Sequence, residues 1–198
     1  MTLAEETFAE IERERTVAVL KTARLVLRAP RREDADAIAR LADDRRIAVN
    51  TARMPSPYGI DDAEQFIATV NRRAGEAVFV ITLDDAPIGA CGIDPYEGVA
   101  EIGYWLGVPY WGEGYATEAA RAVIDYAFGD LQHEALQADA RVSNPASRRV
   151  LEKCAFQWTG VRLLRIRAIN SAAPTDRFRL DRKLWESLKA WGRVTSVA

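Results

Sequence analysis

The stretch VPYWGEGYATEA, residues 108–119, carries a strand into a helix through two glycines. A strand pattern, VAEIGYWLGV, precedes it at residues 99–108. The first N–H groups of a helix have no acceptor within the helix, and the helix dipole makes that end positive. Gly112 and Gly114 leave room for a ligand to reach those groups. The stretch therefore predicts either a tight turn or a binding site for a phosphate or pyrophosphate.

Two common nucleotide motifs fit this stretch poorly. A P-loop needs a Lys and a Ser or Thr directly after its second glycine, and GEGYAT has no Lys there. The dinucleotide fingerprint needs a third Gly or Ala at fixed spacing within a βαβ unit, whereas hairpin patterns precede this turn. Dinucleotide binding is therefore the least favoured reading.

Composition indicates a globular chain without a general affinity for nucleic acid. The 198 residues are 48% hydrophobic and 28% charged, with a net charge of −2. Residues 141–167 hold seven basic residues against Glu152 alone, which is typical of a solvated face. Cys91 and Cys154 lie in apolar stretches without metal or disulfide spacing. We expect a cytoplasmic protein with no metal site and no membrane span.

Working outward, the periodicity predicts one α/β (α+β) domain over residues 1–198, with a helical extension at 1–20. Hairpin-length connections favour a mixed, mostly antiparallel sheet of about seven strands, flanked by about four helices. Strands are expected at 23–30, twice within 76–94, and at 99–108, 134–142, 160–169 and 176–185. Helices are expected at 4–16, 31–44, 61–74, from the glycine turn through Phe128, and at 144–154.

Two motifs in order, LGVPYWGEGYATEAARAVIDYAF and ARVSNPASRRVLEKCAF, resemble the GNAT superfamily of N-acetyltransferases. Within that superfamily the chain looks most like the ribosomal-protein N-terminal (Rim-type) acetyltransferases, and the likeness runs from about Arg24 to Trp185, including TARLVLRAP. The resemblance implies acetyl-CoA as cofactor and a sheet that splays beside it. It also implies direct attack by an amine in a ternary complex.

The resemblance implies a cofactor site around the glycine turn. The pyrophosphate would lie on the backbone N–H groups from Gly112 to Ala116, and the pantetheine would pair with the strand near Leu106 and Val108. Asn144 would meet the pantetheine, although Asn before Pro145 is also a good helix cap. The full expected set is Leu106, Val108, Trp111, Gly112, Glu113, Gly114, Tyr115, Ala116, Thr117 and Asn144. Trp111 stands where the family has Gln or Arg, which removes one anion donor.

Acetyl transfer needs a base for the amine and benefits from an acid for the departing thiolate. Alternation puts Glu101, Gly103 and Trp105 on one face of their strand, where space and shielding would suit a base. Glu101 also matches the family's glutamate, although a solvated strand residue is the competing reading. Asp94 is a weaker rival for the base. His133, the only histidine, is expected to be a surface or packing residue.

Two departures from the family pattern lie in the second motif. Leu151 occupies the place of the usual tyrosine acid, so the Rim-type branch suggests Ser147 instead, against a reading of Ser147 as an ordinary first-turn serine. Ala155 replaces the glycine expected at the helix end, which predicts strain of roughly 1 kcal/mol or a different helix end.

The acceptor and the assembly stay open at this stage. The acceptor amine could be a protein N-terminus or a small amine, and a net charge of −2 weakly favours a cationic one. Residues 50–60 and 167–176 are expected to line the acceptor side. A catalytically silent acyl-CoA-binding sensor or partner protein is the alternative function. Trp185 and Trp191 would permit a homodimer contact.

Overall fold

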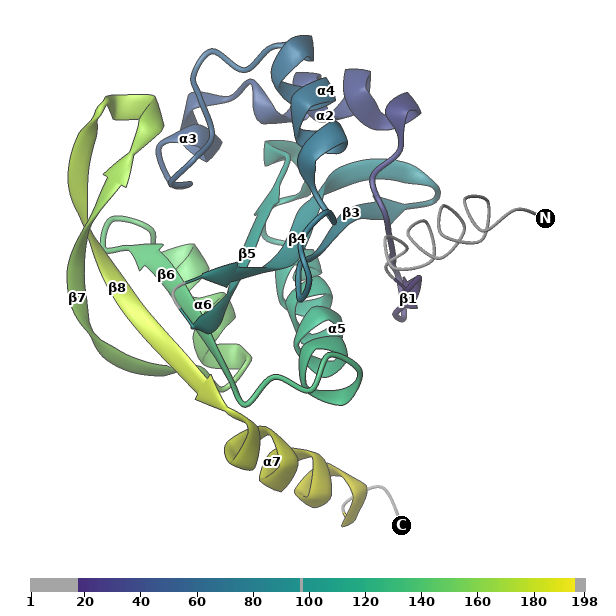
Figure 1. Cartoon of the computed structure of the whole chain (residues 1–198), viewed down its shortest axis with the longest axis vertical. Coiled ribbons are helices and arrows are strands. Elements are labelled where there is room, and N and C mark those ends of the chain that lie inside the picture. Colours follow the sequence, from purple (N-terminus) through teal and green to yellow (C-terminus); the bar gives the residue numbers. More distant parts are fainter. Residues whose placement is uncertain (1–17, 97, 195–198) are drawn as a thin grey trace, which may run out of the picture.

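A computed structural model of the chain describes residues 18–96 and 98–194 (Figure 1). The expected helix at 4–16, within the extension 1–20, therefore lies outside the described residues. The strands are β1 Leu20–Lys21, β2 Val26–Arg28, β3 Ala77–Leu83, β4 Ala86–Tyr96, β5 Val99–Leu106, β6 Ala135–Arg141, β7 Gln157–Ile166 and β8 Ser171–Asp181. The helices are α2 Ala35–Ala42, α3 Arg45–Ala48, α4 Ile60–Thr69, α5 Tyr115–Gly129, α6 Pro145–Lys153 and α7 Arg182–Val194. Short 3₁₀ turns lie at η1 Arg32–Asp34, η2 Val108–Tyr110 and η3 Arg167–Ile169.

The strands form one mixed, mostly antiparallel sheet, which confirms the predicted fold class. Its order is β1-β2-β3-β4-β5-β6-β8-β7, and β5 with β6 is the parallel pair. The described residues hold eight strands and six α-helices, against about seven and about four expected. The two-residue strand β1 and the helices α3 and α7 account for the difference.

Helices cover both faces of the sheet. Helix α5 packs through a stripe of small and apolar residues, including Ala119, Ala120, Val123 and Phe128, whose spacing puts them on one side of the helix. Helix α2 packs through Ala35, Ile38 and Ala42, spaced three and four residues apart, in a second core cluster on Val80 of β3. Figure 1 shows α2 and α4 together above the sheet, with α5 below it.

The sheet splays between β5 and β6. These strands pair only at Ala100 with Leu136 and at Glu101 with Gln137, and no later pair joins them. Beyond that point β5 pairs with β4 on its other edge, as far as Leu106, while β6 continues against β8. The predicted splay is therefore present, and it begins at Glu101.

The first expected strand, 23–30, is interrupted. Residues 22–25 form a turn in which the Thr22 N–H donates to the Leu25 carbonyl (2.9 Å). The Thr22 hydroxyl and the Arg24 N–H both donate to the Glu118 carboxylate of α5, at 2.6 and 2.9 Å. This contact across 94 residues holds the turn, so only Val26–Arg28 remains in the strand.

The last expected strand, 176–185, is wrong at both ends. Strand β8 begins at Ser171, and the chain enters helix α7 at Arg182. Trp185 is not an exposed interface residue: it stacks near Phe128 with ring centroids 5.3 Å apart and donates to Asp125 at 2.8 Å. The side chain of Trp191 lies outside the described residues.

Helix α4 also ends earlier than the expected 61–74. Val70 is extended and Asn71 is left-handed, with φ +59°. The Asn71 side chain bonds the backbone of Val78 in both directions, at 2.9 and 2.7 Å. Asn71 therefore converts the end of the helical pattern into a turn toward β3.

Replacing Ala155 by glycine should stabilise the protein. Ala155 has φ +65°, the left-handed conformation expected for the residue that ends α6. Removing this strain, worth about 1–2 kcal/mol, outweighs the extra chain entropy of glycine in the unfolded state. We expect Ala155→Gly to raise the free energy of unfolding by about 0.5–1 kcal/mol in urea denaturation.

Ala68→Gly is the matched control, because Ala68 is an exposed residue within helix α4. The same substitution there should lower stability by about 0.5–1 kcal/mol. A loss of stability in both variants would mean that Ala155 is not strained.

Candidate active site

One cavity of about 970 Å³ runs along the splay. On one side it is lined by β5, by the glycine turn and by the start of α6, and on the other by residues 50–55 and by the β7–β8 hairpin. The two expected acceptor segments meet here, because the Arg167 N–H donates to the Ala52 carbonyl at 2.9 Å. The cavity therefore has two walls: the glycine turn with the start of α6, and residues 50–55 with the β7–β8 hairpin.

The glycine turn has room for an anion at the start of α5. Gly112 and Gly114 have φ +86° and +83°, which glycine adopts without strain. A Cβ on Gly112 would meet no atom within 4 Å. The first helical hydrogen bond is donated by the Glu118 N–H to the Gly114 carbonyl (3.1 Å), so the N–H groups of residues 115–117 precede it. These groups point out of the helix end beside the cavity.

Arg24 fixes this turn from the far end of the sequence. Its guanidinium lies 2.7 Å from Glu118 Oε2, donates to the Glu113 carbonyl at 3.0 Å, and stacks 4.4 Å from the Tyr115 ring centre. Sequence reasoning gave Arg24 no role, because no local pattern links residues 94 positions apart.

The outer edge of β5 faces the splay. The Gly107 N–H donates to the Ile88 carbonyl, and alternate residues of an antiparallel pair direct their backbone groups to opposite edges. The backbone groups of Tyr104 and Leu106 therefore point into the gap. The Leu106 carbonyl accepts the Trp111 indole N–H at 2.8 Å. Trp111 thus fixes the turn onto the strand. Because the Leu106 carbonyl already accepts this hydrogen bond, the Leu106 N–H is the backbone group that remains for a ligand.

Ser147 and Tyr104 meet on the α6 side of β5. The Tyr104 hydroxyl lies 3.0 Å from Ser147 Oγ and 3.1 Å from the Ser147 carbonyl. Burial raises the pKa of the Tyr104 phenol, which stays protonated at neutral pH. Sequence reasoning missed Tyr104, although a phenol on a buried strand face needs a polar partner. Leu151, one turn further along α6, is 1% exposed.

Asn144 is the N-cap of α6. Its Oδ1 accepts the Ser147 N–H at 3.1 Å, and Pro145 follows at the first helical position. The cap uses the backbone of Ser147, so the serine hydroxyl is not part of it. Asn144 also lines the cavity, where a second contact with a ligand is compatible with capping.

Glu101 lies on the other face of β5, where the splay begins. Burial, together with the charge of Asp139, raises the pKa of Glu101, while Arg162 and Arg53 oppose the shift. The Arg162 guanidinium is 3.6 Å from Glu101 Oε2. Beside it, a Cβ on Gly103 would meet no atom within 4 Å, so a small group can approach. The Glu101 carboxylate is therefore partly removed from solvent, can be reached by a small group past Gly103, and has a pKa above the ordinary range of a glutamate.

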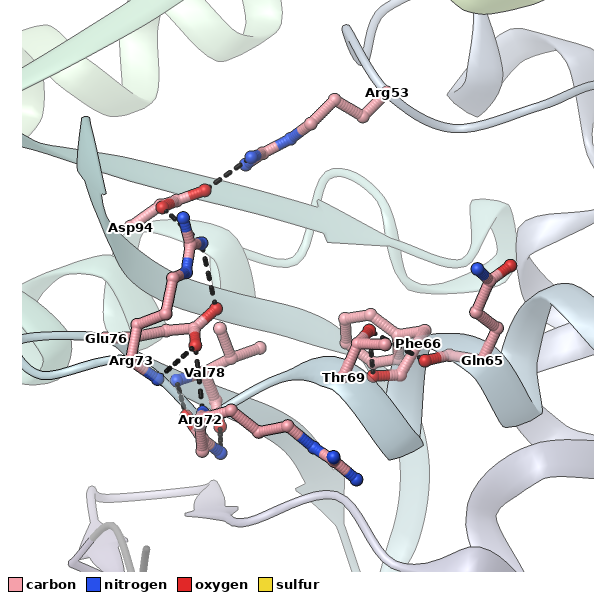
Figure 2. A network of polar contacts seen from close by, with 10 residues as sticks. Arg53, Gln65, Phe66, Thr69, Arg72, Arg73, Glu76, Val78 and Asp94 are labelled. Atoms are coloured by element: carbon pink, nitrogen blue, oxygen red, sulfur yellow. Dashed lines mark hydrogen bonds and ion pairs between the residues drawn. The ribbon is translucent and has the colours of Figure 1, made fainter. Parts of the chain in front are cut away.

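Asp94 faces the same side but is held by two arginines. Figure 2 shows Arg53 and Arg73 approaching its two oxygens from opposite directions. Arg73 donates to Asp94 at 2.7 Å and to Glu76 at 3.3 Å. The network ties residues 50–60 to β4, and it engages the Asp94 carboxylate with cations. Both oxygens of Asp94 are therefore held in ion pairs, whereas Glu101 lies 3.6 Å from one arginine.

Several residues singled out in the sequence lie away from the cavity. Val108 and Glu113 are not among its lining residues, and their carbonyls accept the Trp111 N–H and Arg24 instead. His133 packs near Gly75, and burial lowers the pKa of its imidazole. Burial raises the pKa of both thiols, that of Cys154 to about 11, as expected for small buried hydrophobic residues.

A model of the GNAT acetyltransferase domain matches residues 24–157. The chain is 33% identical over 150 residues to an uncharacterized N-acetyltransferase, p20, of Bacillus licheniformis, across 72% of this chain and 84% of that protein. The chain therefore belongs to the GNAT acetyltransferase family, and it is an acyl-CoA-dependent N-acetyltransferase. It is also 32% identical over 96 residues to the ribosomal-protein-serine acetyltransferase of Escherichia coli K12, across 46% of this chain and 52% of the relative.

Solved structures share the fold. RimJ of Mycobacterium smegmatis, in complex with CoA-disulfide, superposes with a TM-score of 0.74 at 24% identity, covering 90% of this chain and 95% of that one. A GNAT-family acetyltransferase from Bacillus anthracis gives 0.74 at 22% identity, with 84% and 99% covered. These neighbours show that the chain has the fold of GNAT acetyltransferases.

Within residues 18–96 and 98–194, no group of three or more His, Cys, Asp or Glu side chains is arranged to hold a metal ion. None of the helices described there has the length and apolar character needed to cross a membrane.

Proposed function

We propose that the protein transfers the acetyl group of acetyl-CoA to a primary amine, by direct attack in a ternary complex. The observation that carries the proposal is the splay. One cavity runs along the splay and is lined by the glycine turn, which can hold an anion. The Tyr104–Ser147 hydroxyl pair lines it on one face of β5, and Glu101, whose pKa is raised, lines it on the other. Residues 1–198 act as one domain in this proposal.

The residues present fit acetyl-CoA, which supplies an activated acyl thioester. The turn from Trp111 to Gly114 and the N–H groups of Tyr115, Ala116 and Thr117 would hold the pyrophosphate. The free backbone edge of β5 at Tyr104 and Leu106 would bind the pantetheine amides, and Asn144 would contact them from the start of α6. Val108 and Glu113 would act through the shape of the turn.

Glu101 takes a proton from the acceptor amine, directly or through water. An α-amine has a pKa of about 8, so near neutral pH most amine molecules are protonated. Such an amine must lose a proton before it can attack the thioester. Ser147 Oγ donates a proton to the departing thiolate on the opposite face. Tyr104 acts as a positioning residue: its hydroxyl lies 3.0 Å from Ser147 Oγ and 3.1 Å from the Ser147 carbonyl, and so orients the serine beside the cavity. No covalent intermediate on the protein is needed.

The direct test is release of CoA thiol and intact-mass analysis with acetyl-CoA and a panel of peptides, polyamines and aminoglycosides. Acetylated product from one acceptor class, with stoichiometric CoA, is the expected result. Tight acetyl-CoA binding with no product from any acceptor would instead support the silent acyl-CoA binder.

Gly114→Val should weaken acetyl-CoA binding more than tenfold, measured by calorimetric titration. Gly114 is left-handed and begins α5, and a Cβ there would lie 3.5 Å from Arg24 Nη2. A branched side chain would shift the helix start and crowd the space for the anion.

Gly98→Val is the matched control. Gly98 has the same φ of +83° in the β4–β5 turn, and a Cβ there would meet nothing within 4 Å. Equal backbone strain with unchanged affinity in this variant would assign the loss at Gly114 to the anion site. An unchanged affinity in folded Gly114→Val would reduce the glycines to a plain turn.

A further inference from the structure

Arg141 lies on the same face of the sheet as Glu101. Glu101 pairs in parallel with Gln137 of β6, and alternate residues of a strand share a face. Asp139 and Arg141 therefore follow Gln137 on the side of the proposed acceptor. Arg141 is the last residue of β6 and lines the cavity.

The charge of Arg141 has no carboxylate partner among the described residues. Its Nη1 donates to the Val49 carbonyl at 2.8 Å, and its Nε is buried without a hydrogen-bond partner. Arg162, Arg177 and Arg182 also have an unsatisfied buried Nε, but each has a carboxylate oxygen within 4.0 Å. Arg141 is therefore the exception in this group. A partly buried cation without a counter-ion is costly, and a ligand carboxylate would remove that cost.

The neighbouring carboxylates are already engaged. Asp139 is paired with Arg162 and lies 3.9 Å from Arg177. Asp94 binds Arg53 and Arg73. On the opposite wall Arg167 adds a further positive charge to the cavity. This end of the cavity is therefore locally cationic, although the whole chain carries a net charge of −2. A bound ligand responds to the local field of the cleft.

We propose that the acceptor is a peptide or protein N-terminus with an acidic side chain among its first few residues, and that Arg141 binds that carboxylate. The inference rests on the proposed function. Arg141 lies four residue steps after Gln137 in β6, which is about 13 Å along the strand. A carboxylate on the same carbon as the amine cannot span this separation. An extended peptide advances about 3.3–3.6 Å per residue, so residues 2 to 4 of the acceptor can reach the guanidinium.

The test compares peptides that differ only at residues 2 to 4, with Glu or Asp, with Gln or Asn, or with Lys. The measurement is kcat/KM from CoA release, with product mass as identity check. The acidic peptide should be preferred over its amide counterpart by at least about tenfold, the value of one charge-assisted contact. Rising salt should reduce the preference.

Variants separate charge from structure. Arg141→Gln should remove the preference, so that kcat/KM becomes equal for the acidic and the amide peptide, and Arg141→Lys should retain part of the preference. Arg40→Gln, an exposed arginine of α2, should change nothing. Thermal unfolding checks that each variant folds.

Equal rates for acidic and amide peptides, acetylation of small amines alone, or a preference that survives in Arg141→Gln would overturn the inference and leave the proposed acetyl transfer standing. Absence of acetyl transfer to every acceptor by the wild type would count against the proposed function itself.

Discussion

Glu101→Gln should lower kcat by about 10²–10⁴, with acetyl-CoA affinity unchanged. The substitution keeps the size of the side chain and its place at the start of the splay, and removes only the ability to accept a proton. Because the amine must lose a proton during transfer, this loss falls on turnover. Steady-state kinetics beside a cofactor titration measures both quantities.

The pH profile gives a second readout. Burial raises the pKa of Glu101, so kcat in the wild type should fall as pH drops through that raised value, above the ordinary range of a glutamate. In Glu101→Gln this low-pH limb should disappear. Arg53 holds the pKa of Glu101 down, so Arg53→Gln should move the limb to higher pH.

Glu64→Gln, on the exposed side of α4, is the control and should leave kcat and its pH dependence unchanged. Near-normal turnover of Glu101→Gln across the pH range would show that Glu101 is an ordinary strand residue.

Ser147→Ala should lower kcat by about ten- to a hundredfold, with little change in acetyl-CoA affinity. The expected loss is at the lower end of the range for acid catalysis, because a CoA thiol, with a pKa near 8.5 by analogy with Cys, is a fair leaving group. The α6 cap survives, since Asn144 accepts from the backbone of Ser147. A loss confined to affinity would make Ser147 a binding residue.

Tyr104→Phe should lower kcat by about tenfold through loss of the hydroxyl that orients Ser147. If the two hydroxyls act as one unit, the double variant should be no slower than Ser147→Ala alone. Tyr126→Phe, which removes a phenol outside the main cavity, is the control. Additive losses in the double variant would mean that Tyr104 acts independently of Ser147.

The glycine turn, the alternation of β5 and the cap at Asn144 could be predicted from the sequence because each is local. The period of a strand puts Glu101 and Gly103 on one face without knowledge of the rest of the fold. Strain at Ala155 was one of the two outcomes expected from the sequence, because the residue just after a helix commonly adopts the left-handed conformation.

The contacts that complete the site are not local. Arg24 reaches the turn across 94 residues, and the Tyr104–Ser147 pair joins residues 43 positions apart. The switch from β8 to α7 at Arg182 depends on packing of Trp185 against α5, which overrides a strand-like pattern. Net charge averages over the whole chain, so it does not report the arginines that the fold places along one cavity.

Beyond Glu101, the edge of β5 that faces β6 has no strand paired to it. Under the proposed function, the pantetheine takes the position of a missing strand segment. Its hydrogen bonds to β5 then stabilise the sheet as well as bind the cofactor. Binding and folding are then thermodynamically linked: the cofactor stabilises the native state as its concentration rises above the dissociation constant. A cell that depletes its acyl-CoA pool would lower the conformational stability of this enzyme together with its rate.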